Sequence, residues 1–300
     1  MGIDISGLRA IELAVRAVKV DFTSVATLAR HEIHFSKSQF ERVMSRSGGA
    51  MRYRPGFGVS CHQEELLKAF GAETVVSFDG SAYEGASVVA DFNMPLPEAY
   101  RGQFSAYLDF GSMEHVFNVK QVLENIQFLL AIGGTAVILT NCDGHAAHGL
   151  YQFSPVFFFS AFSEANGYSS AHVFLVDIER PDRWLAIDTP ARLGRRNTIP
   201  AGRRLYVVCI AKKAEDRATV SVQQSDYETA AWVEAGHKHC RPVRRSMVFR
   251  AAIDHLPGLA VAVKSAQIRL QMRKLFRAQT LAFEPERCTS LVDIEFRIGV

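Results

Sequence analysis

The strongest constraint on the fold of this chain is a series of short apolar runs, several with an acidic or amide residue at or near the carboxyl end. They lie at residues 23–29, 74–79, 86–92, 104–110 and 133–141. β-branched and aromatic residues are common in these runs, which is typical of buried strands. Between them, residues 62–72 and 119–131 repeat apolar residues at helical spacing and stop near glycines. This alternation predicts a mainly parallel sheet covered by helices on both faces, an α/β fold.

The pattern changes after residue 150. Ser154 and Pro155 are typical of a helix start, and Asn166 and Gly167 of its end. Apolar runs at 171–178 and 203–213 then follow with no clear helix between them, which predicts an antiparallel pair at the end of the sheet. Residues 4–19 are expected to form a leading helix that packs on the sheet.

Composition excludes several classes of protein. The chain has 300 residues, an ordinary charged fraction of 22% and a net charge of +3, which does not indicate a nucleic-acid partner. No apolar run reaches the length of a membrane span, and no signal-peptide pattern opens the chain. The five cysteines are scattered and form no Cys-x-x-Cys pair, which favours free thiols and a cytoplasmic location.

One strand-to-helix junction concentrates chemically active residues. The stretch LDFGSMEHVFN (108–118) places Asp109, Gly111, Glu114 and His115 between a predicted strand and a predicted helix. In an open α/β sheet this is the carboxyl edge, where ligands bind. We therefore expect a ligand site at this edge.

Three motifs are similar to those of a bacterial branch of the class I S-adenosylmethionine-dependent methyltransferases. They are SFDGSAYEGASVVADFNMPLP, LDFGSMEHVFN and HGLYQFSPVFFFSAFSEANGY, and the resemblance covers residues 1–213. It implies a Rossmann-like sheet of five parallel strands closed by an antiparallel hairpin, with S-adenosylmethionine as the cofactor. It also implies a small-molecule or glycan-precursor acceptor, methylated on oxygen or nitrogen.

The first predicted strand departs from the pattern of that branch. SVATLARHEIH carries Ala29 and His31 where the branch usually has glycine and glutamine, whereas Arg30 is kept and is implied to contact the cofactor. A glycine there lets the backbone approach a ligand closely. The one Gly-x-Gly, at 56–58, follows no strand and is a weak nucleotide signal. We interpret residues 30–60 as an insertion whose glycines fold back over the cofactor.

Acids at strand ends are candidates for cofactor binding. Asp79, followed by Gly80, can accept hydrogen bonds from both ribose hydroxyls, and the resemblance supports this role. Asp91 can accept the adenine amino group, and Phe92 can cover the ring. The alternative for Asp91 is a local cap on the following segment.

The chemistry is expected at the next two strand ends. Asp109 and Gly111 would lie beneath the sulfonium and amino-acid end of the cofactor. Glu114, His115 and His148 are the catalytic candidates, because histidine is suited to taking a proton at neutral pH. The alternative for His115 is a structural histidine bonded to the backbone.

The loop after His148 completes the predicted site. Tyr151 and Gln152 are candidates for shaping the acceptor pocket, while the aromatic residues 157–159 are expected in the core. His145 with His148, and HKHC at 237–240, offer metal ligands without a second cluster at matching spacing, so no metal site is predicted.

Residues 214–300 are expected to form a separate, mainly helical, basic accessory region. Residues 241–279 hold nine Lys or Arg and one acid. The stretch 259–279 alternates apolar and basic residues and can pack on the domain, on a second copy in a homodimer, or on an anionic membrane surface. The rival interpretation of the whole chain is a non-catalytic protein that keeps the fold and acts as a partner or scaffold.

Overall fold

The computed structural model describes residues 2–46, 62–189, 203–222, 270 and 280–283. Its helices are α1 (Ile5–Leu13), α2 (Lys37–Arg46), α3 (Gln63–Ala69), α4 (Val119–Leu129) and α5 (Pro155–Ala161), with a π-helix at Ala14–Val18 and 3-10 helices at Glu98–Tyr100, Met113–His115 and Glu164–Asn166. Its strands are β1 (Gly2–Ile3), β2 (Ser24–Leu28), β3 (Glu32–Ile33), β4 (Thr74–Asp79), β5 (Val88–Val89), β6 (Phe104–Phe110), β7 (Leu130–Asp143), β8 (Tyr168–Asp177), β9 (Trp184–Ile187), β10 (Leu205–Lys213) and β11 (Thr280–Phe283).

The chain divides into two compact units. The first consists of residues 1–187, 202–222 and 282–295 and contains the sheet and the site described below. The second consists of residues 188–201, 223–281 and 296–300, most of which lie outside the described residues. The predicted basic helical segment 241–279 is almost entirely among them.

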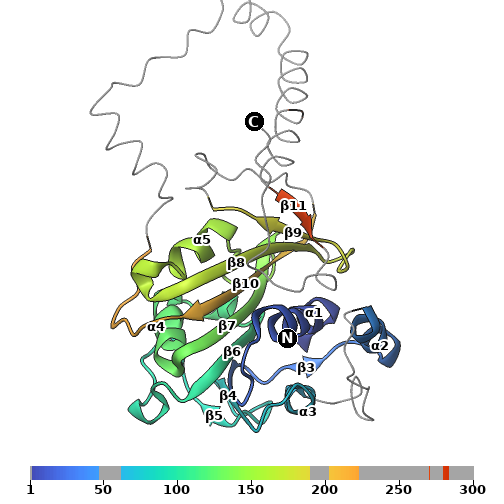
Figure 1. Ribbon diagram of the computed structural model, residues 1–300. Coiled ribbons are helices and arrows are strands. Elements are labelled where there is room, and N and C mark those ends of the chain that lie inside the picture. Colours follow the sequence, from blue (N-terminus) through green and yellow to red (C-terminus); the bar gives the residue numbers. More distant parts are fainter. Residues whose placement is uncertain (1, 47–61, 190–202, 223–269, 271–279, 284–300) are drawn as a thin grey trace, which may run out of the picture. The chain divides into compact units, whose positions relative to one another are not determined.

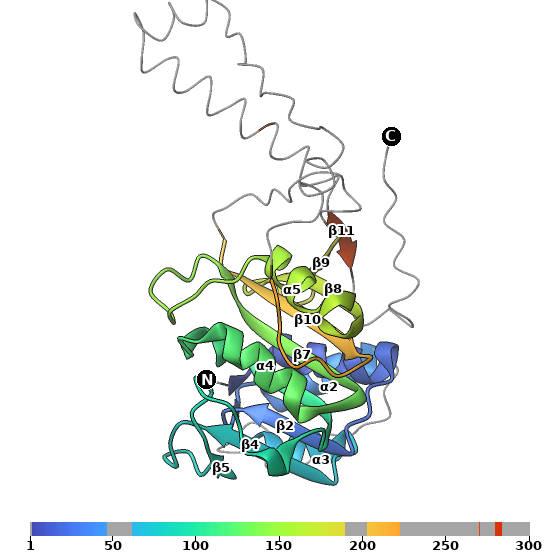
Figure 2. The same ribbon diagram turned by 90° about the vertical axis from the view of Figure 1, so that its left-hand side faces the viewer.

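The sheet of the first unit has the predicted topology. Its strands run in the order β9-β8-β10-β7-β6-β2-β4-β5. The neighbours from β7 to β5 are all parallel, whereas β10 is antiparallel to both β7 and β8. Helices α4 and α5 lie on one side of the sheet and α1 to α3 on the other (Figures 1 and 2). This confirms a Rossmann-like α/β fold with five parallel strands and an antiparallel end.

Local sequence explains where the elements begin. Asp4 accepts hydrogen bonds from the backbone of Ser6 and Gly7 at 2.8 and 3.0 Å, which starts α1. Asn118 accepts from the backbone of Gln121 at 3.3 Å and starts α4 in the same way. The central strand β6 is buried along most of its length, as expected for a strand covered on both faces.

The end of α4 differs from the prediction. The helix stops at Leu129, and the glycines expected to end it, Gly133 and Gly134, lie inside β7. A buried lysine replaces the glycine cap, because Lys213 Nζ donates to the carbonyls of Gln127 and Leu130 at 2.6 Å each. These bonds satisfy carbonyls that a helix end leaves without intrahelical partners.

Other boundaries also differ. β5 is only two residues long, and β9 was not anticipated between the two predicted antiparallel strands. Of the predicted insertion 30–60, residues 30–46 contain β3 and α2, and the Gly-x-Gly at 56–58 lies outside the described residues. Cys142 and Cys209 are free thiols, as expected. Among the described residues, no helix combines the length and the apolar character that crossing a membrane requires.

Candidate functional site

A cavity of about 450 Å³ lies at the carboxyl ends of four neighbouring parallel strands. The lining includes Ala29 after β2, Asp79 and Gly80 at the end of β4, Asp91 after β5 and His115 after β6. Its volume is within the range of small-molecule and cofactor sites. The strand ends that the sequence indicated therefore converge on one space.

The two acids of this cavity differ in their surroundings. Asp79 is half-buried, and one of its oxygens, Oδ1, accepts from the backbone of Ser81 at 3.1 Å. Asp91 is exposed, and its Oδ1 accepts from the backbone and side-chain nitrogens of Asn93 at 2.9 and 2.7 Å. These bonds lower the pKa of Asp91 below its ordinary value. Asp91 thus caps a local turn, which matches the alternative predicted for it, although no helix follows.

Phe92 is buried rather than displayed on the cavity wall. Only 2% of it is exposed, and its ring packs edge-on against Phe78 with centroids 6.0 Å apart. It lines the cavity but leaves little ring surface for a ligand. Its position favours a role in supporting the floor of the cavity.

Ala29 keeps a backbone conformation typical of glycine. Its φ is +66°, in the left-handed region that side chains with a Cβ rarely occupy. Its N–H donates to the carbonyl of Phe78 at 2.7 Å, and its carbonyl accepts from the Thr27 hydroxyl at 2.8 Å. The turn expected after the first strand is therefore present, with a methyl group added at the cavity wall.

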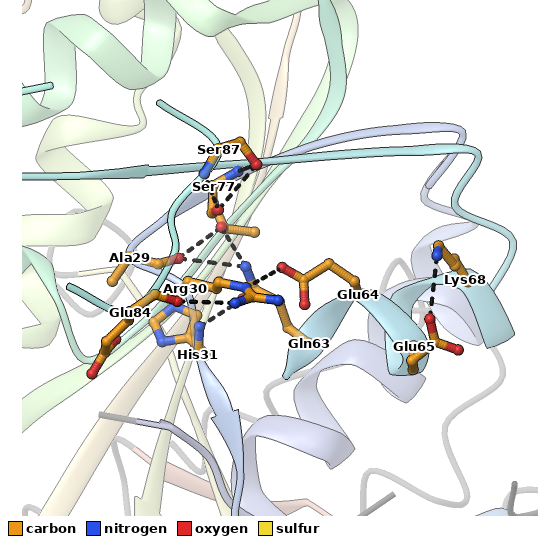
Figure 3. Close-up of polar contacts among 11 residues, drawn as sticks. Ala29, Arg30, His31, Gln63, Glu64, Glu65, Lys68, Ser77, Glu84 and Ser87 are labelled. Carbon is orange, nitrogen blue, oxygen red and sulfur yellow. Dashed lines mark hydrogen bonds and ion pairs between the residues drawn. The ribbon is translucent and has the colours of Figure 1, made fainter. Parts of the chain in front are cut away.

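Arg30 does not line the cavity. Figure 3 shows its guanidinium between Glu64 of α3 and the loop after β4. It pairs with the Glu64 carboxylate at 2.7 Å and donates to the carbonyl of Glu84 at 2.9 Å. The same loop is held to β4 by the hydroxyls of Ser77 and Ser87. Arg30 thus supports the cavity wall, and the residues that line the cavity do not include it, so its predicted contact with the cofactor stays a prediction.

A smaller cavity of about 80 Å³ lies beside the turn after β6. Gly111, Glu114, Asn141, His148 and Tyr206 are among the residues that line it. Glu114 is 1% exposed, and burial raises the pKa of its carboxyl. Its Oε2 accepts from the Thr140 hydroxyl at 2.7 Å, whereas its buried Oε1 has no hydrogen-bond partner in the described part of the chain.

The histidines lie next to one another. The ring centroids of His115 and His148 are 5.2 Å apart, and those of His148 and His145 are 6.3 Å apart. His145 also stacks on Tyr206 at 5.4 Å. Burial, together with the neighbouring His148, lowers the pKa of His115 and of His145. Glu114, His115 and His148 each place a ligand atom within 4.8 Å of the others. The three catalytic candidates therefore form one cluster.

Asp109 lies away from both cavities. It is fully buried and accepts from the backbone of Ser112 and Met113 at 2.8 and 3.1 Å. Burial, reinforced by Glu114, raises its pKa well above the ordinary range. Its hydrogen bonds position the turn that carries Glu114, and its predicted place beneath the cofactor stays a prediction.

Tyr151 and Gln152 hold the loop after β7 in place. The Tyr151 hydroxyl donates to the carbonyl of Phe117 at 2.7 Å, and Gln152 Oε1 accepts from the backbone of His145 at 2.9 Å. Neither lines the two cavities described above. Both act through the position of the loop.

Sequence reasoning missed several residues of the site. Asn93 lines the larger cavity, and its side-chain and backbone oxygens accept from Asn118 at 2.9 and 3.2 Å. Asn141 and Tyr206 line the smaller cavity. The spacing of Asn93 two residues after Asp91 is a turn signal that could have indicated its place.

No protein-family model and no curated protein matches the sequence. Among solved structures, the 1,6-didemethyltoxoflavin N1-methyltransferase of Burkholderia thailandensis is 15% identical, with a TM-score of 0.38, over 70% of this chain and 80% of that one. A complex of the Haloferax volcanii Trm112 methyltransferase activator with a methyltransferase is 14% identical, with a TM-score of 0.35, over 70% of this chain and 91% of that one. A Haemonchus contortus phosphoethanolamine N-methyltransferase is 12% identical, with a TM-score of 0.36, over 70% of this chain and 58% of that one. At these values the likeness assigns no activity to this chain.

Proposed function

We propose that this chain is an S-adenosylmethionine-dependent methyltransferase that acts on oxygen or nitrogen of a small-molecule or glycan-precursor acceptor. The observation that carries the proposal is the cavity of about 450 Å³ at the carboxyl ends of β2, β4, β5 and β6. In α/β sheets, nucleotide ligands bind at this edge. Two of the three motifs that resemble class I methyltransferases, at 77–97 and 108–118, contribute residues to the same cavity.

The residues present fit such a cofactor. Among the residues that the structure describes, no protein donor forms a hydrogen bond to Asp79 Oδ2, so this oxygen can accept from ribose hydroxyls. Gly80 and Ala29 bring backbone next to the same space. When bound, the cofactor would supply an electrophilic methyl group. The chain itself would bind and orient the reactants, and in such reactions positioning accounts for much of the acceleration.

The acceptor is assigned to the side of the cavity where His115 lies. His115 lines the larger cavity and His148 the smaller one, with 5.2 Å between their ring centroids. Their imidazoles can take a proton from a hydroxyl or an ammonium group near neutral pH. The exposed side chains of Phe117 and Leu150 flank this side and offer apolar surface to an acceptor.

Calorimetric titration with S-adenosylhomocysteine tests the proposal. We expect Asp79→Ala to bind it roughly ten- to a hundredfold more weakly, the equivalent of ~1.5–3 kcal/mol for charged hydrogen bonds. Asp21→Ala is the matched control, since Asp21 is an exposed acid before β2, at the opposite edge of the sheet. Equal affinity in the parent and Asp79→Ala would contradict the assignment of Asp79.

A non-catalytic protein with this fold is the second candidate. The observation that favours it is the Cβ of Ala29, which stands where the related enzymes usually carry glycine. A protein of this kind would keep the fold, with or without the cofactor, and would act as a partner or scaffold. Absence of any heat of binding with S-adenosylhomocysteine would support this second candidate over the first.

A further inference from the structure

The cluster between the two cavities has the composition of a metal site. Glu114, His115 and His148 each bring one ligand atom within 4.8 Å of the others. Two imidazoles and a carboxylate are donors typical of zinc and other divalent transition metals. We propose that these three residues bind a divalent transition-metal ion of the zinc type. The position of the ion beside the acceptor rests on the proposed function, whereas the binding itself rests on the cluster.

Glu114 provides a second, independent observation. It is 1% exposed, and its Oε2 accepts from the Thr140 hydroxyl at 2.7 Å. Its Oε1 is buried and has no hydrogen-bond partner in the part of the chain that the structure describes. A buried carboxylate oxygen is unfavourable unless a donor or a cation balances it. A bound cation would be the missing partner.

The segments that carry the ligands are fixed before any ion binds. Asp109 accepts from two backbone N–H groups just ahead of Glu114, and the backbone of Leu150 donates to the Glu114 carbonyl at 2.7 Å. Asn141 Nδ2 donates to the carbonyl of His148 at 3.4 Å. These contacts hold the β6 turn and the β7 loop together. A site held in this way loses little conformational freedom when it takes up an ion.

Three protein ligands leave coordination positions open, as in catalytic zinc sites. An open position can be taken by a hydroxyl oxygen, whose proton is then lost more easily. In the loaded protein His148 would be a ligand rather than a base, and the ion would lower the pKa of a bound acceptor hydroxyl, whose proton would pass to solvent water. Sequence spacing predicted no metal site here, because the three residues are brought together only by the folding of two loops.

Cobalt is the best probe, since its visible spectrum reports the ligand type. Full-length protein treated with EDTA is titrated with Co²⁺ by absorption and calorimetry. We expect one ion per chain at this cluster, without a thiolate charge-transfer band. A thiolate band would instead place the ion at a cysteine, such as Cys240 of the HKHC segment, and would overturn the assignment.

Two variants and a matched control locate the ion. His148→Ala and Glu114→Gln should each lower Co²⁺ affinity by at least about tenfold, because each removes a ligand atom or its charge. His145→Ala is the control, since it lies in the same loop but outside the cluster. Circular dichroism and thermal melts confirm that each variant is folded. Parent-like affinity in both variants, or no binding by the parent, would overturn the proposal.

The same proteins separate this proposal from the methyltransferase assignment. Asp79→Ala should bind S-adenosylhomocysteine roughly ten- to a hundredfold more weakly and keep the Co²⁺ affinity of the parent. His148→Ala should show the reverse, with affinity for S-adenosylhomocysteine within a few-fold of the parent. A parent that binds Co²⁺ but not S-adenosylhomocysteine would contradict the methyltransferase and leave the metal site supported.

Discussion

Replacing Ala29 with glycine should stabilise the protein. Ala29 holds a φ of +66°, and left-handed backbone costs an L-residue roughly 1–2 kcal/mol. Glycine removes this cost, but it also raises the entropy of the unfolded chain, which costs the folded state about 0.4–1 kcal/mol. The net gain in the free energy of unfolding therefore lies between about 0 and 1.6 kcal/mol, centred on about 0.8 kcal/mol. For a domain of this size that is a rise in Tm of about 1–4 °C. Denaturant unfolding and thermal melts measure both quantities.

The same substitution should also affect the cavity. Ala29 lines the space of about 450 Å³, and its backbone is fixed by the bond from its N–H to the Phe78 carbonyl at 2.7 Å. Loss of the methyl group lets a ligand approach the backbone more closely. We therefore expect tighter binding of S-adenosylhomocysteine in Ala29→Gly.

Lys19→Gly is the matched control for this experiment. Lys19 also has a left-handed backbone, with a φ of +59°, but it is exposed at the end of the π-helix, away from the cavity. Both variants should gain stability, and only Ala29→Gly should change cofactor affinity. A loss of stability in Ala29→Gly would refute the strain argument. Equal changes in affinity in the two variants would refute the cavity argument.

Two further predictions concern the turn after β6. Burial raises the pKa of Glu114, so the folded protein binds the proton of this carboxyl more tightly than the unfolded chain does. The parent should therefore lose stability relative to Glu114→Gln as the pH rises from about 4.5 through the raised pKa. Denaturant titrations at a series of pH values measure this difference. An equal pH dependence in the two proteins would contradict this. Gly149→Ala should lower the free energy of unfolding by about 1–2 kcal/mol, because residue 149 has a left-handed φ of +74°. It should also weaken Co²⁺ binding, because the added Cβ would lie 2.9 Å from Glu114 Cγ. Gly133→Ala is the control, since residue 133 has a left-handed φ of +85° and open space around its Cβ. It should lower the stability through backbone strain and leave Co²⁺ binding unchanged.

Much of the larger cavity could be predicted from the sequence. Strand period and helical spacing indicate a parallel sheet, and parallel strands bring their carboxyl ends to one edge. Asp79, Gly80, Asp91 and His115 were all placed at that edge by this reasoning, and all line the cavity. The rule works here because it depends only on strand direction, which the alternation with helices specifies.

Side-chain direction within a turn could not be predicted in the same way. Asp109 lies near the end of β6 and Glu114 in the turn that follows, yet Asp109 faces the backbone of the turn while Glu114 borders the smaller cavity. The difference arises from the 3-10 helix Met113–His115, whose local path no periodicity specifies. Likewise, Arg30 follows a strand that ends at the cavity, but its guanidinium pairs with the carboxylate of Glu64 on α3 and does not line the cavity.

The cluster of Glu114, His115 and His148 depends on a contact between distant segments. His148 lies on a loop that returns to the β6 turn because Leu150 donates to the Glu114 carbonyl and Gly149 leaves room beside the Glu114 side chain. Neither contact produces a repeat or a spacing motif, so a metal search based on spacing overlooks it. The 3-10 helix also directs adjacent residues to different sides, with His115 at the larger cavity and Glu114 at the smaller one. One short turn therefore borders both cavities, and under the two proposals above it would join a cofactor space to an ion site, with an acid and a histidine side by side at this junction.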